Sequence, residues 1–180
     1  MANVLLGFQT FMDAGPPFLP LLILLVLTII PVTVVHELGH ALAARSRLGT
    51  EGEISVGHTG RLLDFHLGNL ALSINLVADP RKPAGQATFD GSRATALDVM
   101  WIALAGPGAS FVGWVVVVLL YNAAPSTGLW HDILWTAALG SAFAVLNLIP
   151  LRLEERRGGR PIFTDGRIAI DAAKAAQGRV

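Results

Sequence analysis

Long apolar runs and one alternating segment dominate the pattern of hydrophobic and polar positions. The apolar runs lie at about residues 18–44, 97–121 and 129–150. Each is long enough for the roughly 20 residues that a helix needs to cross the hydrocarbon core of a bilayer. Small residues at 103–110 would let the second run pack closely against a neighbouring helix. The pattern therefore predicts three transmembrane helices.

A different period appears between the first and second runs. The apolar members of this alternation are Leu70, Leu72, Ile74 and Leu76. Their spacing is typical of a β-strand with one buried face. Shorter runs at 53–56 and 62–67 would supply partner strands, whereas residues 79–93, with their prolines and glycines, are predicted to form a loop. We expect a small β-sheet within about residues 51–80, with the strand at 70–77 on its edge.

The composition favours a membrane environment over water. Hydrophobic residues make up 53% of the chain and charged residues only 14%, whereas an ordinary soluble domain carries about 25% charged residues. The formal net charge is zero, so the excess of Lys and Arg that nucleic-acid binding requires is lacking. We expect a multi-pass membrane protein, mainly α, that contacts the lipid bilayer and no nucleic acid.

The positions of the basic residues predict an orientation. Six of the 13 Lys and Arg residues fall within residues 45–93 and seven within 152–179, while 1–17 and 122–131 contain none. Segments rich in Lys and Arg stay in the cytoplasm according to the positive-inside rule. The N-terminus is therefore expected outside and the C-terminus in the cytoplasm. Residues 1–180 would form a single core with a cytoplasmic sheet between the first and second spans.

A metal-binding pattern lies near the inner end of the first run. His36, Glu37 and His40 form the His-Glu-x-x-His sequence of zinc peptidases. Residues four apart on a helix share a face, so both imidazoles can bind one ion while Glu37 acts as the catalytic base. Ionisable groups inside an apolar span are costly, which makes these residues a functional-site hypothesis.

A catalytic zinc ion usually takes a third protein ligand. The chain has no cysteine, so this ligand must be a histidine or a carboxylate. The candidates expected on the inner side are His58, Asp64, His66, Asp98, Glu154, Glu155 and Asp165. Asp165 is favoured because Gly166 leaves room for a close approach and the apolar pair at 162–163 can return the chain to the membrane. His58 and His66 are more typical of ordinary surface histidines.

Three elements together resemble the site-2 protease family of intramembrane zinc metalloproteases. They are His-Glu-x-x-His in a transmembrane helix, Gly106-Pro107 in the next core helix, and Asn147-x-x-Pro150 followed by Asp165-Gly166. The resemblance implies that Asp165 is the third zinc ligand and that Asn147 binds substrate or stabilises the oxyanion. In many relatives the Asp-Gly pair follows the asparagine more closely, where this chain has Glu155, so Glu155 remains an alternative ligand.

The expected activity is therefore that of a zinc metalloendopeptidase. Its cofactor would be a zinc ion, and its substrates would be membrane proteins cut in or near a transmembrane segment, as the resemblance implies. The alternative is a non-catalytic membrane protein, either a metal-binding part of a channel or transporter or an inactive protease relative. Glu37 separates the two, because only proteolysis needs it as a base.

Overall fold

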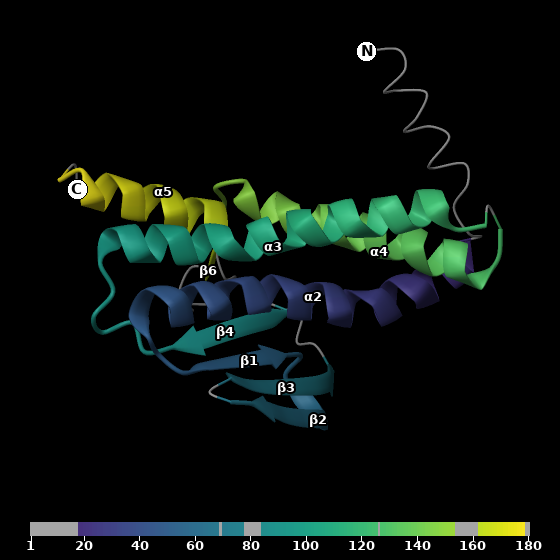
Figure 1. Ribbon diagram of the computed structural model, residues 1–180, viewed down its shortest axis with the longest axis horizontal. Helices are drawn as coiled ribbons and strands as arrows, with labels where there is room; N and C mark the ends of the chain where they lie inside the picture. The colour runs from purple at the N-terminus through teal and green to yellow at the C-terminus, as the bar shows by residue number, and fades with distance from the viewer. Residues whose placement is uncertain (1–17, 69, 78–83, 126, 154–161, 179–180) are drawn as a thin grey trace, which may run out of the picture.

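The computed structural model describes residues 18–68, 70–77, 84–125, 127–153 and 162–178. Within them, three helices are long and apolar enough to cross a membrane. These are α2 (Phe18–Leu48), α3 (Ala96–Ala123), and α4 (Leu129–Val145) with its 3-10 extension η1 (Leu146–Leu148). They pack side by side along their lengths (Figure 1). The predicted helices and a small sheet between the first two are thus confirmed.

The ends of α2 and α3 follow from local capping. The predicted first span stopped at 44, but α2 continues to Leu48, because helical hydrogen bonds do not require apolar side chains. It ends where Gly49 takes a left-handed φ of 65° and its N–H donates to the Arg45 carbonyl. The helix α3 begins with a capping box between Thr95 and Asp98, and it runs without interruption through Pro107.

The sheet has four strands in the order β2-β3-β1-β4. Their bounds are Gly52–Val56 for β1, Thr59–Leu67 for β2, Leu70–Val77 for β3 and Gly85–Phe89 for β4. β1 pairs in parallel with β3 and antiparallel with β4, and β2 pairs antiparallel with β3. Its β1 and β4 strands lie along α2 (Figure 1).

Two predictions about this sheet are wrong. Gly85–Phe89 lies in the segment predicted as a loop, yet it forms β4 by pairing with β1. That pairing is between distant residues, which local proline and glycine content does not reveal. The strand Leu70–Val77 is not an edge, because β1 returns beside it in parallel and covers its second side.

The core joins the sheet to the first helix. Ile54 and Val56 of β1 are buried against Ala41 of α2, with Val34 and Leu38 packed around them. Fully burying one valine or isoleucine side chain stabilises the fold by about 1.5–3 kcal/mol relative to leaving it exposed. The sheet is therefore fixed along the C-terminal half of α2.

The last elements return to the bundle. β5 (Arg152–Leu153) and β6 (Ile162–Phe163) pair antiparallel, and α5 (Asp165–Ala176) follows directly. This helix lies along α3 (Figure 1). Its buried face is built from Gly166, Ala169 and Ala172, whose small size allows a close approach.

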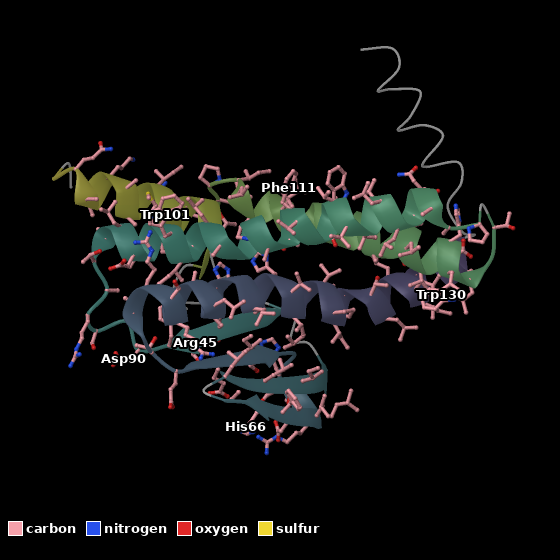
Figure 2. All side chains as sticks on the ribbon, in the orientation of Figure 1. Arg45, His66, Asp90, Trp101, Phe111 and Trp130 are labelled. Atoms are coloured by element: carbon pink, nitrogen blue, oxygen red, sulfur yellow. The ribbon has the colours of Figure 1, made fainter. Side chains whose placement is uncertain are left out.

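Large apolar side chains cover the outside of the helices. Leu27 is 63% exposed, Leu119 65% and Trp130 72%. Figure 2 shows Phe111 and Trp130 on the bundle, whereas His66 lies on the sheet away from the helices. A soluble monomer rarely exposes so much contiguous apolar surface. The outer surface of the bundle is therefore suited to lipid.

Candidate metal centre

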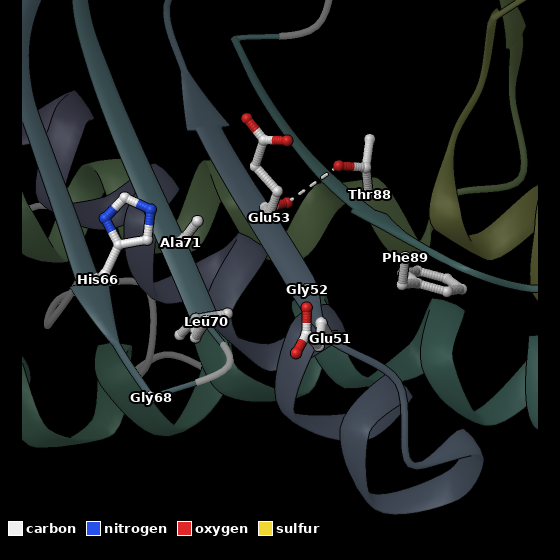
Figure 3. A pocket seen from close by; sticks show the side chains of 9 residues that line it. All are labelled: Glu51, Gly52, Glu53, His66, Gly68, Leu70, Ala71, Thr88 and Phe89. Carbon is white, nitrogen blue, oxygen red and sulfur yellow. Dashed lines mark hydrogen bonds between the residues drawn. The ribbon is translucent and has the colours of Figure 1, made fainter.

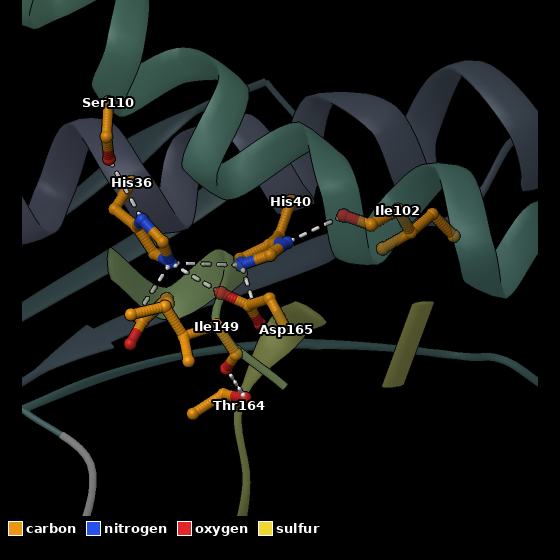
Figure 4. A network of polar contacts seen from close by, with 8 residues as sticks. His36, His40, Ile102, Ser110, Ile149, Thr164 and Asp165 are labelled. Carbon is orange, nitrogen blue, oxygen red and sulfur yellow. Dashed lines mark hydrogen bonds and ion pairs between the residues drawn. The ribbon is translucent and has the colours of Figure 1, made fainter. Parts of the chain in front are cut away.

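His36, His40 and Asp165 meet between α2 and the start of α5 (Figure 4). The two Nε2 atoms are 3.3 Å apart, Asp165 Oδ2 lies 3.0 Å from His36 Nε2, and Asp165 Oδ1 lies 3.5 Å from His40 Nε2. Both histidines are buried and the Asp165 side chain is only 17% exposed. These three residues can hold a metal ion.

The donor set fits a catalytic metal. In a tetrahedral zinc site with bonds of about 2.0–2.1 Å, neighbouring ligand atoms lie roughly 3.4 Å apart. The separations of 3.0, 3.3 and 3.5 Å in this cluster are close to that value. Two imidazoles and one carboxylate are also a common set at catalytic zinc sites.

No protein-family model and no curated protein matches this sequence. The function of the cluster must therefore be argued from its geometry.

Asp165 reaches the histidines through a tightly folded turn. The Thr164 hydroxyl donates to the Ile149 carbonyl over 2.6 Å, and the Leu151 N–H donates to the same hydroxyl over 2.9 Å. At Gly166 a Cβ would overlap the Leu148 carbonyl, so only glycine lets α5 start this close to η1. The Asp-Gly pair is thus explained by packing as well as by chemistry.

The Asp165 carboxyl is held in its ionised form. Burial alone would raise its pKa, but hydrogen bonds from His36 and His40 and their nearby positive charge outweigh burial and lower the pKa to about 2. An ionised carboxylate is the form that binds a metal cation.

The helix α3 contacts both imidazoles on the side away from Asp165. His36 Nδ1 lies 2.9 Å from Ser110 Oγ, and His40 Nδ1 donates to the Ile102 carbonyl over 2.7 Å. A Cβ at Gly106 would overlap the His40 ring. Ser110 and Ile102 were not among the predicted site residues; Ser110 is the last member of the run of small residues at 103–110, and Ile102 carries no sequence signal because only its backbone carbonyl is used.

Glu37 lies beside the sheet rather than within the cluster. It is buried, and the Ala87 N–H of β4 donates to its carboxylate. A Cβ at Gly85 would come within 2.9 Å of Glu37 Cγ and 3.0 Å of Oε1. The strand that was predicted as a loop therefore holds the predicted base.

Asn147 belongs to η1, at the C-terminal end of α4. Its Nδ2 lies 3.5 Å from His36 Nε2. The amide thus faces the same nitrogen that would bind a metal, from the side of the exposed apolar residues of η1.

The other predicted ligands lie elsewhere. Asp64 pairs with Arg61 over 2.7 Å on β2, and Asp98 caps α3 and pairs with Arg47 over 3.7 Å. His58 follows β1 in a turn, and His66 is exposed on β2. Glu154 and Glu155 lie outside the described residues. Among the described candidates, Asp165 is the one that meets both histidines.

A shallow hollow of about 500 Å³ lies on the sheet (Figure 3). Its lining includes Glu51, Glu53 and His66, which come from the sheet and from the residue just before it. None of these belongs to the His36, His40 and Asp165 group, where the described residues bring three donors together. The hollow is therefore separate from the candidate metal centre.

Proposed function

We propose that this chain is an intramembrane zinc metalloprotease that hydrolyses peptide bonds in or near transmembrane segments. The observation that carries the proposal is the convergence of His36, His40 and Asp165 beside Glu37, inside a bundle with a lipid-compatible surface. A metal site of this donor set next to a buried carboxylate is suited to hydrolysis.

Each residue of the site has a defined part in this reaction. His36, His40 and Asp165 would hold the zinc ion. When bound, zinc would supply the Lewis acidity that polarises the scissile carbonyl and activates water. Glu37 takes a proton from the attacking water at its carboxylate and delivers it to the leaving amine. The Asn147 amide can donate to the substrate carbonyl from the η1 side of the cluster.

The proposed orientation follows from charge. The three apolar helices would cross the bilayer with the N-terminus outside, because the basic residues concentrate in the segments expected inside. The metal centre would then lie toward the cytoplasmic side, because His36 and His40 come late in the apolar run, shortly before the basic residue Arg45. Catalysis at this depth combines access to water with access to a substrate in the membrane.

Apolar side chains next to Asn147 fit a hydrophobic substrate. The exposed ones are Leu146, Leu148, Ile149 and Leu151. They lie within four residues of Asn147 in the sequence, and the Asn147 amide faces His36. An apolar transmembrane segment would bury these side chains and gain hydrophobic stabilisation, whereas a polar peptide would not.

An extended substrate also has a strand to pair with. The Gly57 N–H donates to the Ala84 carbonyl, so in this antiparallel pair the backbone groups of Gly85, Ala87 and Phe89 point away from β1. The bond from Ala87 to the Glu37 carboxylate places this outer edge beside Glu37, the proposed base. We propose this edge as the position where an unwound substrate binds.

The decisive experiment compares the wild type with Glu37→Gln, purified and co-expressed with single-span membrane proteins. We expect cleavage to fall by at least about 100-fold, as for loss of a general base. Zinc content by mass spectrometry should stay the same, because Glu37 is not a ligand. Cleavage that persists in Glu37→Gln would rule out this mechanism, and zinc binding without fragments in either protein would favour the non-catalytic alternative.

A further inference from the structure

We propose that Ser110 is a positioning residue that orients the His36 imidazole and thereby sets how tightly the cluster holds its metal. The inference rests on the metal site of the proposed function but not on proteolysis. Nothing in the metal-binding pattern itself points to Ser110, because it lies 74 residues from His36.

The contact between the two side chains is short and shielded from water. Ser110 Oγ lies 2.9 Å from His36 Nδ1, and the residues are 2% and 5% exposed. Water cannot readily replace a hydroxyl buried to this extent. Asp165 and His40 contact the ring at Nε2, where a metal would bind, whereas Ser110 on α3 holds it at Nδ1, on the opposite side.

The two imidazoles are held in equivalent ways. The Ile102 carbonyl can only accept, so His40 Nδ1 carries a proton, and with a metal bound the Nε2 lone pair would be the ligand. A serine hydroxyl can accept in the same manner from His36 Nδ1 when Nε2 binds a metal. Since a backbone carbonyl survives every substitution, Ser110 is the member of this pair that mutation can test.

The register of the two helices explains why these residues meet the rings. Ile102 and Ser110 are eight residues apart on α3, slightly more than two turns, so they lie on one face. Gly106 lies between them at the point where a Cβ would overlap the His40 ring. This face of α3 is therefore shaped to receive both imidazoles.

The test measures zinc affinity of the full chain in detergent by competition with a chromophoric chelator. Partners of this kind typically contribute 10–100-fold to metal affinity, so Ser110→Ala should bind zinc about 10–100-fold more weakly. The matched control is Ser141→Ala, which removes the hydroxyl of another buried serine, on α4. The zinc affinity of Ser141→Ala should equal that of the wild type. In the absence of metal, Ser110→Ala and Ser141→Ala should have the same melting temperature.

A spectroscopic measurement separates orientation from general packing. With Co²⁺ in place of zinc, the visible absorption bands should shift in Ser110→Ala and stay unchanged in Ser141→Ala. Equal zinc affinity in Ser110→Ala and wild type would overturn the inference, and so would an equal loss in both variants. Should Ser110→Ala fail to fold, Ser110→Cys keeps the volume with a poor acceptor, and undiminished zinc affinity there would also overturn it. A wild type that binds no zinc would instead refute the proposed function.

Discussion

Two buried histidine clusters in this molecule have similar parts but different geometry. His36 and His40 on α2 meet Asp165 at the start of α5, and all three donors converge. At the end where α3 leads into α4, His131 is also buried, lies 3.5 Å from Asp132 and stacks 4.6 Å from the Tyr121 ring. Only the first cluster has a third donor among the described residues.

The difference shows what a metal site needs beyond a buried histidine and a carboxylate. His36 and His40 are four residues apart and share a helix face, whereas His131 and Asp132 are adjacent in the sequence, contact each other at 3.5 Å and belong to no group of three donors among the described residues. A donor from a distant segment completes the first set, 129 residues away from His36. Convergence of separate elements, more than burial, distinguishes the candidate centre.

The largest effect should come from removing the distant donor. Asp165→Ala leaves two imidazoles with no anionic ligand, so zinc affinity should fall by more than the roughly 100-fold seen for outer partners of a metal site. Asp132→Ala is the matched control at the other cluster and should leave zinc affinity unchanged. Isothermal titration of both variants measures the contrast, and full zinc content in Asp165→Ala would remove Asp165 from the ligand set.

A smaller effect should follow from crowding the first cluster through α3. Gly106→Ala places a methyl group where the His40 ring lies, and overpacking of this kind costs about 1–3 kcal/mol. Gly108→Ala adds the same group to open space on the same helix. We expect thermal unfolding and zinc titration to show a loss only for Gly106→Ala. Equal behaviour of the two variants would contradict the described contact between α3 and His40.

A change at β4 should separate the base from the metal ligands. Gly85→Ala brings a Cβ against Thr33 and the Glu37 side chain, so cleavage should fall about 10-fold, less than the roughly 100-fold or more that complete loss of a general base costs. Zinc content should remain that of the wild type. Gly91→Ala is the control, because its Cβ meets only Phe89 at 3.8 Å. Loss of zinc in Gly85→Ala would mean that β4 supports the whole centre and not Glu37 alone.

The smallest effect is expected at the second cluster itself. His131→Gln removes the imidazole that stacks on Tyr121, at a distance from all three donors. Zinc stoichiometry and cleavage should both match the wild type, since no donor is lost. A measurable drop in zinc content would show that the two clusters are coupled and would undo the comparison between them.

The long helices and the alternating strands were predictable from the sequence because each depends on a local pattern. Apolar runs of sufficient length predict α2, α3 and α4, and the period-two segment predicts β3. The order in which the strands pair does not depend on a local pattern. β1 lies between β3 and β4 because of contacts between distant residues, so neither the central place of β3 nor the existence of β4 follows from alternation.

In the candidate site, too, some residues were predictable from local sequence spacing and others were not. The spacing of His36 and His40 reveals a shared face, and Gly166 next to Asp165 marks a close approach. No sequence pattern predicts the contacts of Ser110 and Ala87. These contacts depend on the register of α3 against α2 and on the position of β4 beside Glu37. Register between elements is set by packing and leaves no spacing signal in the chain.

The separation between Asp165 and the first helix has a consequence for biosynthesis. Because His36 and Asp165 are 129 residues apart, a nascent chain that has inserted only α2 carries two candidate ligands and the proposed base but no complete donor set. The site is assembled only when the last described helix begins to fold against α3. Any hydrolytic activity would therefore be withheld while the protein is still being made, which protects neighbouring membrane proteins at the site of synthesis.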